Sequence, residues 1–80
     1  MTVEVLFFAR LKEIFGGSCS INIPAGSCVA AAVEFLAGEC ADPDFKKLPL
    51  RFAVNENFET GGQELKDQDQ LAIMTPMSGG

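Results

Sequence analysis

The residue types at the end of the sequence point to the terminal carboxylate as a reactive group. Gly79 and Gly80 leave the terminal carboxylate sterically open and the backbone before it conformationally free. A carboxylate is a poor acyl donor until it is activated, for example as an acyl-adenylate that another enzyme makes with ATP. Sulfide or a persulfide that displaced AMP would leave a thiocarboxylate, which can deliver sulfur. The plain alternative is a frayed, glycine-rich end.

Segment 76–80 has the shape that insertion into a narrow active site requires. Pro76 cannot donate to a sheet ladder, so regular structure should end before it. Fully extended, five residues reach at most about 17 Å. We therefore predict a folded domain over 1–75 and a flexible tail over 76–80. The candidate insertion residues are Pro76, Met77, Ser78 and Gly79, and Gly80 carries the reactive carboxylate.

Three cysteines offer a second kind of sulfur chemistry. Cys19, Cys28 and Cys40 are odd in number and show no Cys-x-x-Cys spacing, which indicates a reducing compartment rather than a disulfide framework. Cys28 stands where a helix is expected to begin, and a helix N-terminus can stabilise a thiolate. A persulfide carrier that uses Cys28 is therefore a separate hypothesis. Ordinary core packing is favoured for all three cysteines, because cysteine is among the most buried residue types.

Composition excludes several other functions. The chain has no histidine, which removes the commonest general base and metal ligand. Asp67 and Asp69 are read as turn residues, so we predict no metal site and no cofactor bound by the chain. A net charge of −5 disfavours nucleic acid as a partner and would steer a basic partner surface towards the chain. Eighty residues leave no room for a deep cleft, so no activity is expected of the chain alone.

No targeting or membrane segment is visible in the sequence. The first residues form a strand-like run with no basic stretch before an apolar one, so we expect no signal peptide. No apolar run approaches the roughly 20 residues that span a bilayer. A cytoplasmic location follows as the expectation.

Alternating apolar residues predict strands over 3–8, 19–23, 50–54 and 71–74, and a very short strand is possible at Phe58. One good helix is predicted over 28–37, with Ser27 as its N-cap and Gly38 as the residue after its end. A helical turn is expected at 11–15. Leu65 should plug the core from a loop. This order predicts an α+β domain: a mixed sheet of four to five strands, with one main helix packed on one face.

One helix covers only one face of such a sheet. The alternation assigns nine apolar residues to the helix side: Val3, Val5, Phe7, Ile21, Ile23, Phe52, Val54, Leu71 and Ile73. The other face then carries a second apolar set: Leu6, Phe8, Ala53, Ala72 and Met74. Large exposed apolar patches usually mark interaction sites, so these five residues are candidates for a partner interface. The alternative is that loops such as 39–49 fold over part of this face.

Three segments resemble the small, sulfur-carrying subunits of molybdopterin synthase (MoaD type). They are residues 5–13 (VLFFARLKE), Val54-Asn55 followed by residues 65–73 (LKDQDQLAI), and residues 75–80 (TPMSGG). The family usually has glycine between the two aspartates, where this chain has Gln68. If that turn requires a positive φ, glutamine costs about 1 kcal/mol there. The resemblance implies the β-grasp, or ubiquitin-like, fold.

The resemblance also implies a function. An adenylating enzyme would activate Gly80 with ATP, and a sulfur donor enzyme would convert it to a thiocarboxylate. The tail would enter the large synthase subunit, where its sulfur is transferred to cyclic pyranopterin monophosphate to build the molybdopterin dithiolene. Two small and two large subunits would form a heterotetramer.

Three further functions remain open beside this one. The sulfur carrier of thiamine thiazole synthesis shares the fold and the tail chemistry. A ubiquitin-like protein modifier would join Gly80 to lysines of other proteins. A purely structural adaptor would bind its partner whether or not Gly80 is present.

Overall fold

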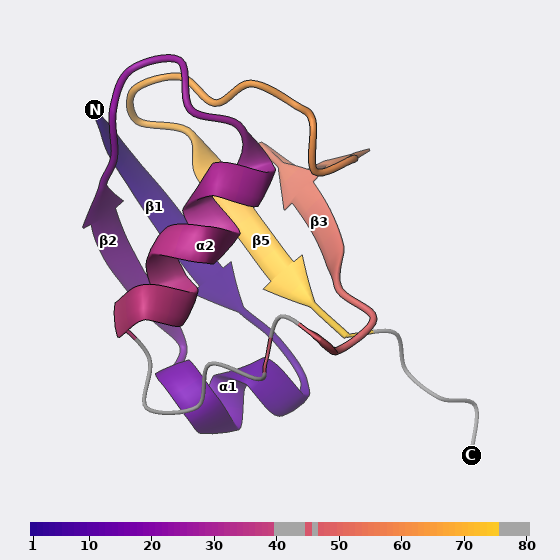
Figure 1. The fold of residues 1–80 in the computed structure, drawn as a ribbon. Coiled ribbons are helices and arrows are strands. Elements are labelled where there is room, and N and C mark those ends of the chain that lie inside the picture. The colour runs from indigo at the N-terminus through magenta and orange to yellow at the C-terminus, as the bar shows by residue number, and fades with distance from the viewer. Residues whose placement is uncertain (40–44, 46, 76–80) are drawn as a thin grey trace.

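The computed structural model describes residues 1–39, 45 and 47–75, so the predicted tail and Cys40 lie outside the described residues. The elements follow in the order β1 (Thr2–Phe7), α1 (Arg10–Phe15), β2 (Ser18–Asn22), α2 (Val29–Glu39), β3 (Arg51–Val54), β4 (Asn57–Glu59) and β5 (Gln70–Met74). In Figure 1, α2 lies across one face of a single sheet, and α1 lies below the edge at which β1 and β5 end. The layering is the α+β arrangement that the sequence predicts.

The strands form one five-stranded sheet in the order β2-β1-β5-β3-β4. The central strands β1 and β5 are parallel, with Val5 opposite Leu71, and the other neighbours are antiparallel. Two antiparallel hairpins joined through a central parallel pair, with one helix across the sheet, constitute the β-grasp fold. The predicted fold is confirmed.

The core lies between α2 and the sheet. Eight of the nine residues assigned to the helix side are buried, and Phe52 packs against them while half-buried. From α2 the core receives Val29, Ala32, Val33, Leu36 and Ala37. Leu65 is buried as predicted, and its amide donates to the Ser27 carbonyl at 2.9 Å. No polar or charged residue is buried among residues 1–39, 45 and 47–75. The described interior is therefore formed by apolar side chains.

The loop after α2 contributes an aromatic residue that sequence reasoning placed in a polar connection. Phe45 is buried in the core, where its ring meets the Phe15 ring edge-on at a centroid distance of 4.9 Å. Phe15 in turn stacks on Phe7 at 4.5 Å. Leu48 packs against the same core cluster. The described part of this loop therefore packs on the core side of the sheet and does not cover the other face.

The ends of α2 differ from the prediction. The helix begins at Val29, and its first two amides donate at 2.9 Å to the Gln63 and Gly61 carbonyls. The Ser27 hydroxyl instead donates to the Pro24 carbonyl at 2.7 Å. Backbone from a distant loop thus satisfies donors for which a side-chain cap was expected. At the other end, Gly38 lies inside the helix rather than after it.

The turn before β5 places Gln68 at a positive φ, the case in which glutamine is expected to cost stability. The Asp69 amide donates to the Lys66 carbonyl at 3.0 Å, which closes a β-turn, and Gln68 has φ 70°. A positive φ at the third position defines a type II turn, which favours glycine. The turn is held from outside, because the Gln68 amide donates to the Thr2 carbonyl at 2.7 Å.

We expect Gln68→Gly to stabilise the domain by about 0.5–1 kcal/mol, because glycine adopts this φ without the steric cost of a Cβ. For a domain of this size that corresponds to a rise in Tm of roughly 4 °C. Thermal unfolding followed by circular dichroism measures it. Asn55→Gly, at φ 49°, is the matched control: it removes an amide whose Nδ2 donates to Asp69 at 2.9 Å and should not stabilise the domain. A lower Tm for Gln68→Gly would contradict the assignment of strain to this turn.

Candidate functional site

The chain leaves the sheet beside the end of β1. Because β1 and β5 are parallel, Phe7 and Met74 lie at the same end of the sheet, where both strands terminate. We call this end the tail edge. The Phe8 amide extends this pairing by donating to the Ile73 carbonyl at 3.2 Å. Thr75, the last described residue, is half-buried there. Phe8, Ala9, Met74 and Thr75 line a depression of about 420 Å³. Any segment that continues from Thr75 therefore starts at an apolar surface.

A strained turn holds Phe8 in this position. The Leu11 amide donates to the Phe8 carbonyl at 3.2 Å, and Ala9 between them has φ 55° and ψ −132°. These angles belong to the second position of a type II′ turn, which glycine normally occupies. Such a residue costs of the order of 1–3 kcal/mol, and strain of this kind gathers at functional sites. The turn directs the chain from β1 into α1 and leaves the Phe8 side chain 47% exposed.

The sheet face opposite α2, which we call the open face, carries an apolar row at its tail half. Leu6 lies opposite Ala72, Ala72 opposite Ala53, and Ala53 opposite Phe58. Phe8 and Met74 extend the apolar surface towards the tail edge. The other half of the face is polar: Glu4 lies between Ser20 and Gln70, and the Ser20 hydroxyl donates to the Glu4 carboxylate at 2.9 Å. The apolar surface is thus confined to the half from which the chain leaves.

The structure brings the five predicted interface residues together on this face. Leu6, Ala72 and Met74 are half-buried and Phe8 is exposed, whereas Ala53 is only 7% exposed. Ala53 is small and lies between Ala72 and Phe58, so it forms the floor of the patch rather than a contact surface. Its part in a partner interface stays a prediction.

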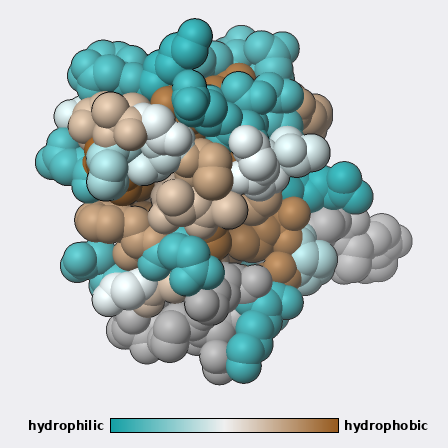
Figure 2. Space-filling view, turned by 45° about the horizontal axis from the view of Figure 1, so that its top comes forward, coloured by the Kyte–Doolittle hydropathy of each residue, from teal (hydrophilic) through white to brown (hydrophobic). Residues whose placement is uncertain are grey.

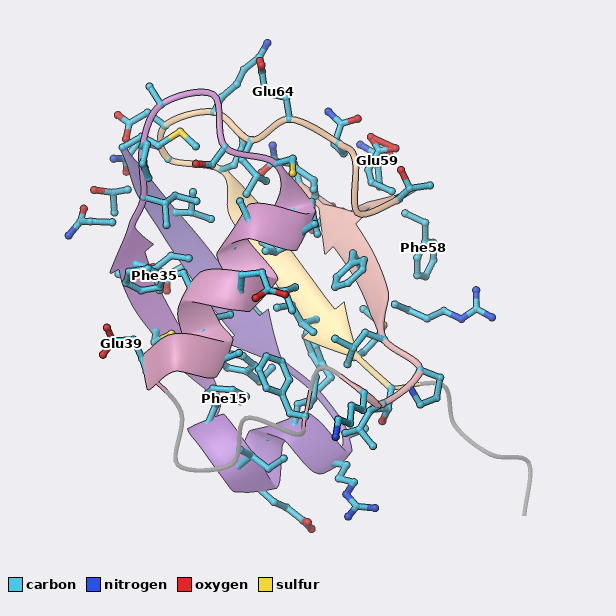
Figure 3. The ribbon with its side chains drawn as sticks, viewed as in Figure 1. Phe15, Phe35, Glu39, Phe58, Glu59 and Glu64 are labelled. Atoms are coloured by element: carbon cyan, nitrogen blue, oxygen red, sulfur yellow. The ribbon has the colours of Figure 1, made fainter. Side chains whose placement is uncertain are left out.

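Sequence reasoning missed Phe58 as a member of this surface. Phe58 is 73% exposed on the edge strand β4, and in Figure 3 its ring points away from the sheet. Its place follows from the two-residue turn Asn55-Glu56, in which both residues have positive φ, a pattern typical of type I′ hairpins. That turn places Asn57 opposite Val54 and therefore Phe58 opposite Ala53. The signal that could have placed Phe58 is the short distance between the predicted strand ending at Val54 and the one at Phe58, since a two-residue turn fixes the hairpin register.

Comparison with known proteins settles the family. The model of the ThiS family matches residues 5–80 of this chain. The chain belongs to the ThiS family. It is therefore a sulfur carrier of the ThiS and MoaD kind, and the resemblance found in the sequence is confirmed.

Relatives of this carrier include a molybdopterin synthase sulfur carrier subunit from Arabidopsis thaliana, which is 29% identical over 79 residues, 98% of this chain and 82% of the relative. Among solved structures, SAMP1 from Haloferax volcanii has a TM-score of 0.86 at 21% identity, with both chains fully covered. The complex of subunits 1 and 2 of molybdopterin-converting factor from Helicobacter pylori contains a chain with a TM-score of 0.69 at 22% identity, again with both chains fully covered. At these identities the two structures support the fold.

The carrier's two described cysteines lie outside the depression beside Thr75. Cys19 pairs with Val5 and packs partly against the core, as predicted. Burial, with a smaller contribution from the Glu4 carboxylate, raises the pKa of the Cys19 thiol, which opposes thiolate formation at neutral pH. Cys28 is half-buried before α2 and forms a backbone bridge with Glu64. Both thiols are free, and neither lines the depression beside Thr75.

The paired carboxylates have structural partners. Asp67 accepts from the Thr2 amide at 2.7 Å, and this hydrogen bond is the main reason that the pKa of Asp67 is lowered. Asp69 accepts from the Lys66 amide at 2.8 Å. Both carboxylates thus fasten the loop before β5 to its surroundings. Within the described ranges, no cluster of three or more side chains suits a metal ion, and no helix is long and apolar enough to cross a membrane.

Proposed function

We propose that this protein is the sulfur carrier subunit of a molybdopterin synthase. The observation that carries the proposal is the match to the ThiS family, which runs to residue 80 and so includes the Ser-Gly-Gly ending. The Arabidopsis relative, which is similar along nearly the whole chain, favours molybdopterin over other sulfur acceptors. Gly80 is the group that bears sulfur, and the chain has no catalytic activity of its own.

The proposed chemistry takes place at the Gly80 carboxylate. One of its oxygens attacks the α-phosphorus of ATP in a partner adenylating enzyme, which releases pyrophosphate and forms an acyl-adenylate. Hydrosulfide then attacks the carbonyl carbon and expels AMP, leaving a thiocarboxylate and a proton. When an enzyme-bound persulfide is the donor, a second thiol must cleave the acyl disulfide that forms. The chain binds no cofactor for these steps, and ATP belongs to the activating partner.

The apolar half of the open face is the proposed binding surface for the large synthase subunit. Leu6, Phe8, Met74 and Phe58 present apolar side chains on the half of the sheet where β5 ends. A partner seated there has its active site within the reach of about 17 Å that five extended residues provide. Pro76, Met77, Ser78 and Gly79 would enter that site and place Gly80 beside cyclic pyranopterin monophosphate. Two carriers with two large subunits would form the complex, in the cytoplasm.

Intact mass measurement tests the carrier chemistry. The purified chain is incubated with the adenylating enzyme, ATP and a sulfur source, and its mass is compared with that of a sample without ATP. The expected gain equals the exchange of one oxygen for sulfur and maps to the C-terminal peptide. An unchanged mass with an enzyme that is active on its own carrier would overturn the proposal.

The acceptor is tested separately with the loaded carrier. Cyclic pyranopterin monophosphate and the large subunit should consume the thiocarboxylate and return the carrier to its original mass. Turnover with thiazole synthase and its substrates instead would assign the protein to thiamine thiazole synthesis. Attachment of Gly80 to lysines of other proteins in a cell extract would identify it as a protein modifier.

We expect Cys28→Ala to load sulfur at the wild-type rate, because the sulfur is bound at Gly80 and Cys28 lies at the start of α2. Loading is followed by intact mass over time. Ser27→Ala is a neighbouring control that keeps the thiol and removes the hydroxyl bonded to Pro24. The contradicting result is that Cys28→Ala stops loading while Ser27→Ala does not, and that a cysteine peptide of the wild type gains a whole sulfur atom. The hypothesis of a persulfide carrier would then replace that of a thiocarboxylate carrier.

A further inference from the structure

The charge of this acidic protein is divided between the two ends of the sheet. At the tail edge lie the cations Arg10, Lys12 and Arg51, with Glu13 on α1 and Glu39 at the end of α2. At the opposite edge, where β1 and β5 begin, lie Glu56, Glu64, Asp67 and Asp69 together with Lys66. In Figure 3, Glu64 lies on the side of the molecule away from the end of β5, whereas Glu39 lies towards α1. Figure 2 shows hydrophilic side chains gathered over that opposite end.

Two of the cations border the apolar depression. Arg51 lies opposite Met74 in the sheet. Since its neighbour Phe52 packs against the core, the Arg51 side chain belongs to the open face. Arg10 follows Ala9, which lines the depression, and begins α1. Both arginines are exposed. Arg51 therefore stands beside Met74 on the open face, and Arg10 directly follows the turn that lines the depression. An apolar centre with a polar rim is the usual anatomy of a protein interface.

We propose that the large synthase subunit meets this end of the carrier with an apolar centre and an acidic rim, and that Arg10 and Arg51 pair with its carboxylates. This inference rests on the proposed function. It also differs from the expectation from net charge: a chain at −5 should attract a basic partner, but the two residues beside the apolar depression are arginines. The acidic opposite end is then turned away from the partner, which orients the carrier during encounter.

Guanidinium groups suit this role. Arginine presents several donors in a planar fork that can pair with a carboxylate through two hydrogen bonds. Contacts at an exposed rim act mainly on the association rate and are screened by salt. The expected signature is therefore a change in association rate that depends on ionic strength, while the apolar centre sets the lifetime of the complex.

Three charge reversals separate local from net charge. Arg10→Glu, Arg51→Glu and Lys66→Glu each change the net charge by the same amount, but Lys66 lies at the opposite end, in the turn before β5. Association of each variant with the large subunit from the same organism is measured by stopped-flow at salt concentrations from low to high. We expect either arginine reversal to slow association roughly 3- to 10-fold at low salt, with the difference shrinking at high salt. Lys66→Glu should stay within about twofold of the wild type.

Arg10→Gln and Arg51→Gln remove one charge without introducing its opposite, and serve if a reversal disturbs folding. They should give smaller changes in the same direction. If all three reversals slowed association equally, net charge alone would explain the association rate, and the inference would be overturned. Faster association of the arginine reversals would show a basic partner surface and also overturn it. If the wild type binds and delivers sulfur in either case, the proposed function stands. If the wild type does not bind the large subunit at all, the proposed function and this inference fail together.

Discussion

A chain that lacks Gly80 is expected to fold normally and to take up sulfur at least about 100-fold more slowly than the wild type. Its carboxylate moves back to Gly79, so the reacting carbon lies one residue, about 3.5 Å, short of its place in the adenylating site. Misplacement of a reacting group by even 1 Å can cost about 100-fold in rate. The loading rate is measured by intact mass at saturating ATP and enzyme.

The control for this deletion is Gly80→Ala, which keeps the chain length and the carboxylate and adds one methyl group. We expect it to load more slowly than the wild type and faster than the deletion, because it narrows access without moving the carbon. The last residue of the described core is Ile73, so both variants should keep the wild-type Tm. Wild-type loading by the deleted chain would place the sulfur elsewhere and end the thiocarboxylate proposal.

Much of this fold was predictable because each strand has one buried face. The alternation over residues 3–7, 21–23 and 71–73 identified core positions that the structure confirms. The parallel pairing of β1 with β5 was not predictable from alternation, which is silent about neighbours, and came from family resemblance. Gly38 was misjudged because a glycine inside a helix resembles a helix end in sequence. Phe45 was missed because it is a single apolar residue in a polar segment, with no periodicity to reveal it.

The candidate site was predictable to a different degree at its two parts. The reactive group proposed at Gly80 rests on sequence alone, because a glycine-rich end beside a family pattern can be recognised without a structure. The open face was predicted from counting apolar residues against the single helix available to cover them. The proposed rim of Arg10 and Arg51 could not be predicted, because the two residues are far apart in sequence. They come to the same end of the sheet through the pairing of β1 with β5 and of Arg51 with Met74. Net charge even pointed to the opposite kind of partner, since it averages over both ends of the sheet.

Two neighbouring phenylalanines provide the strongest test of the division between core and interface. Phe7 is 2% exposed and stacks on Phe15, whereas Phe8 is 47% exposed beside Met74. We expect Phe7→Ala to destabilise the domain by about 3–5 kcal/mol, because it leaves a cavity in a small core. That is a large part of the free energy of unfolding of a typical domain. Phe8→Ala should change stability by less than about 1 kcal/mol.

For binding to the large subunit, we expect the larger loss from Phe8→Ala and the smaller one from a change at Phe7. Phe8→Ala should weaken the complex with the large subunit by about 2 kcal/mol, roughly 30-fold in Kd, because it removes an aromatic anchor at the centre of the contact. Urea unfolding and calorimetric titration measure the two quantities on the same samples. Phe7→Ala is titrated only where its folded fraction is high, and Phe7→Leu supplies a milder core change with near-normal binding. The contradicting result is that Phe8→Ala binds the large subunit as tightly as the wild type, whereas Phe7→Leu binds it more weakly. The partner would then not bind the open face, and its binding surface would have to lie on the α2 side of the sheet.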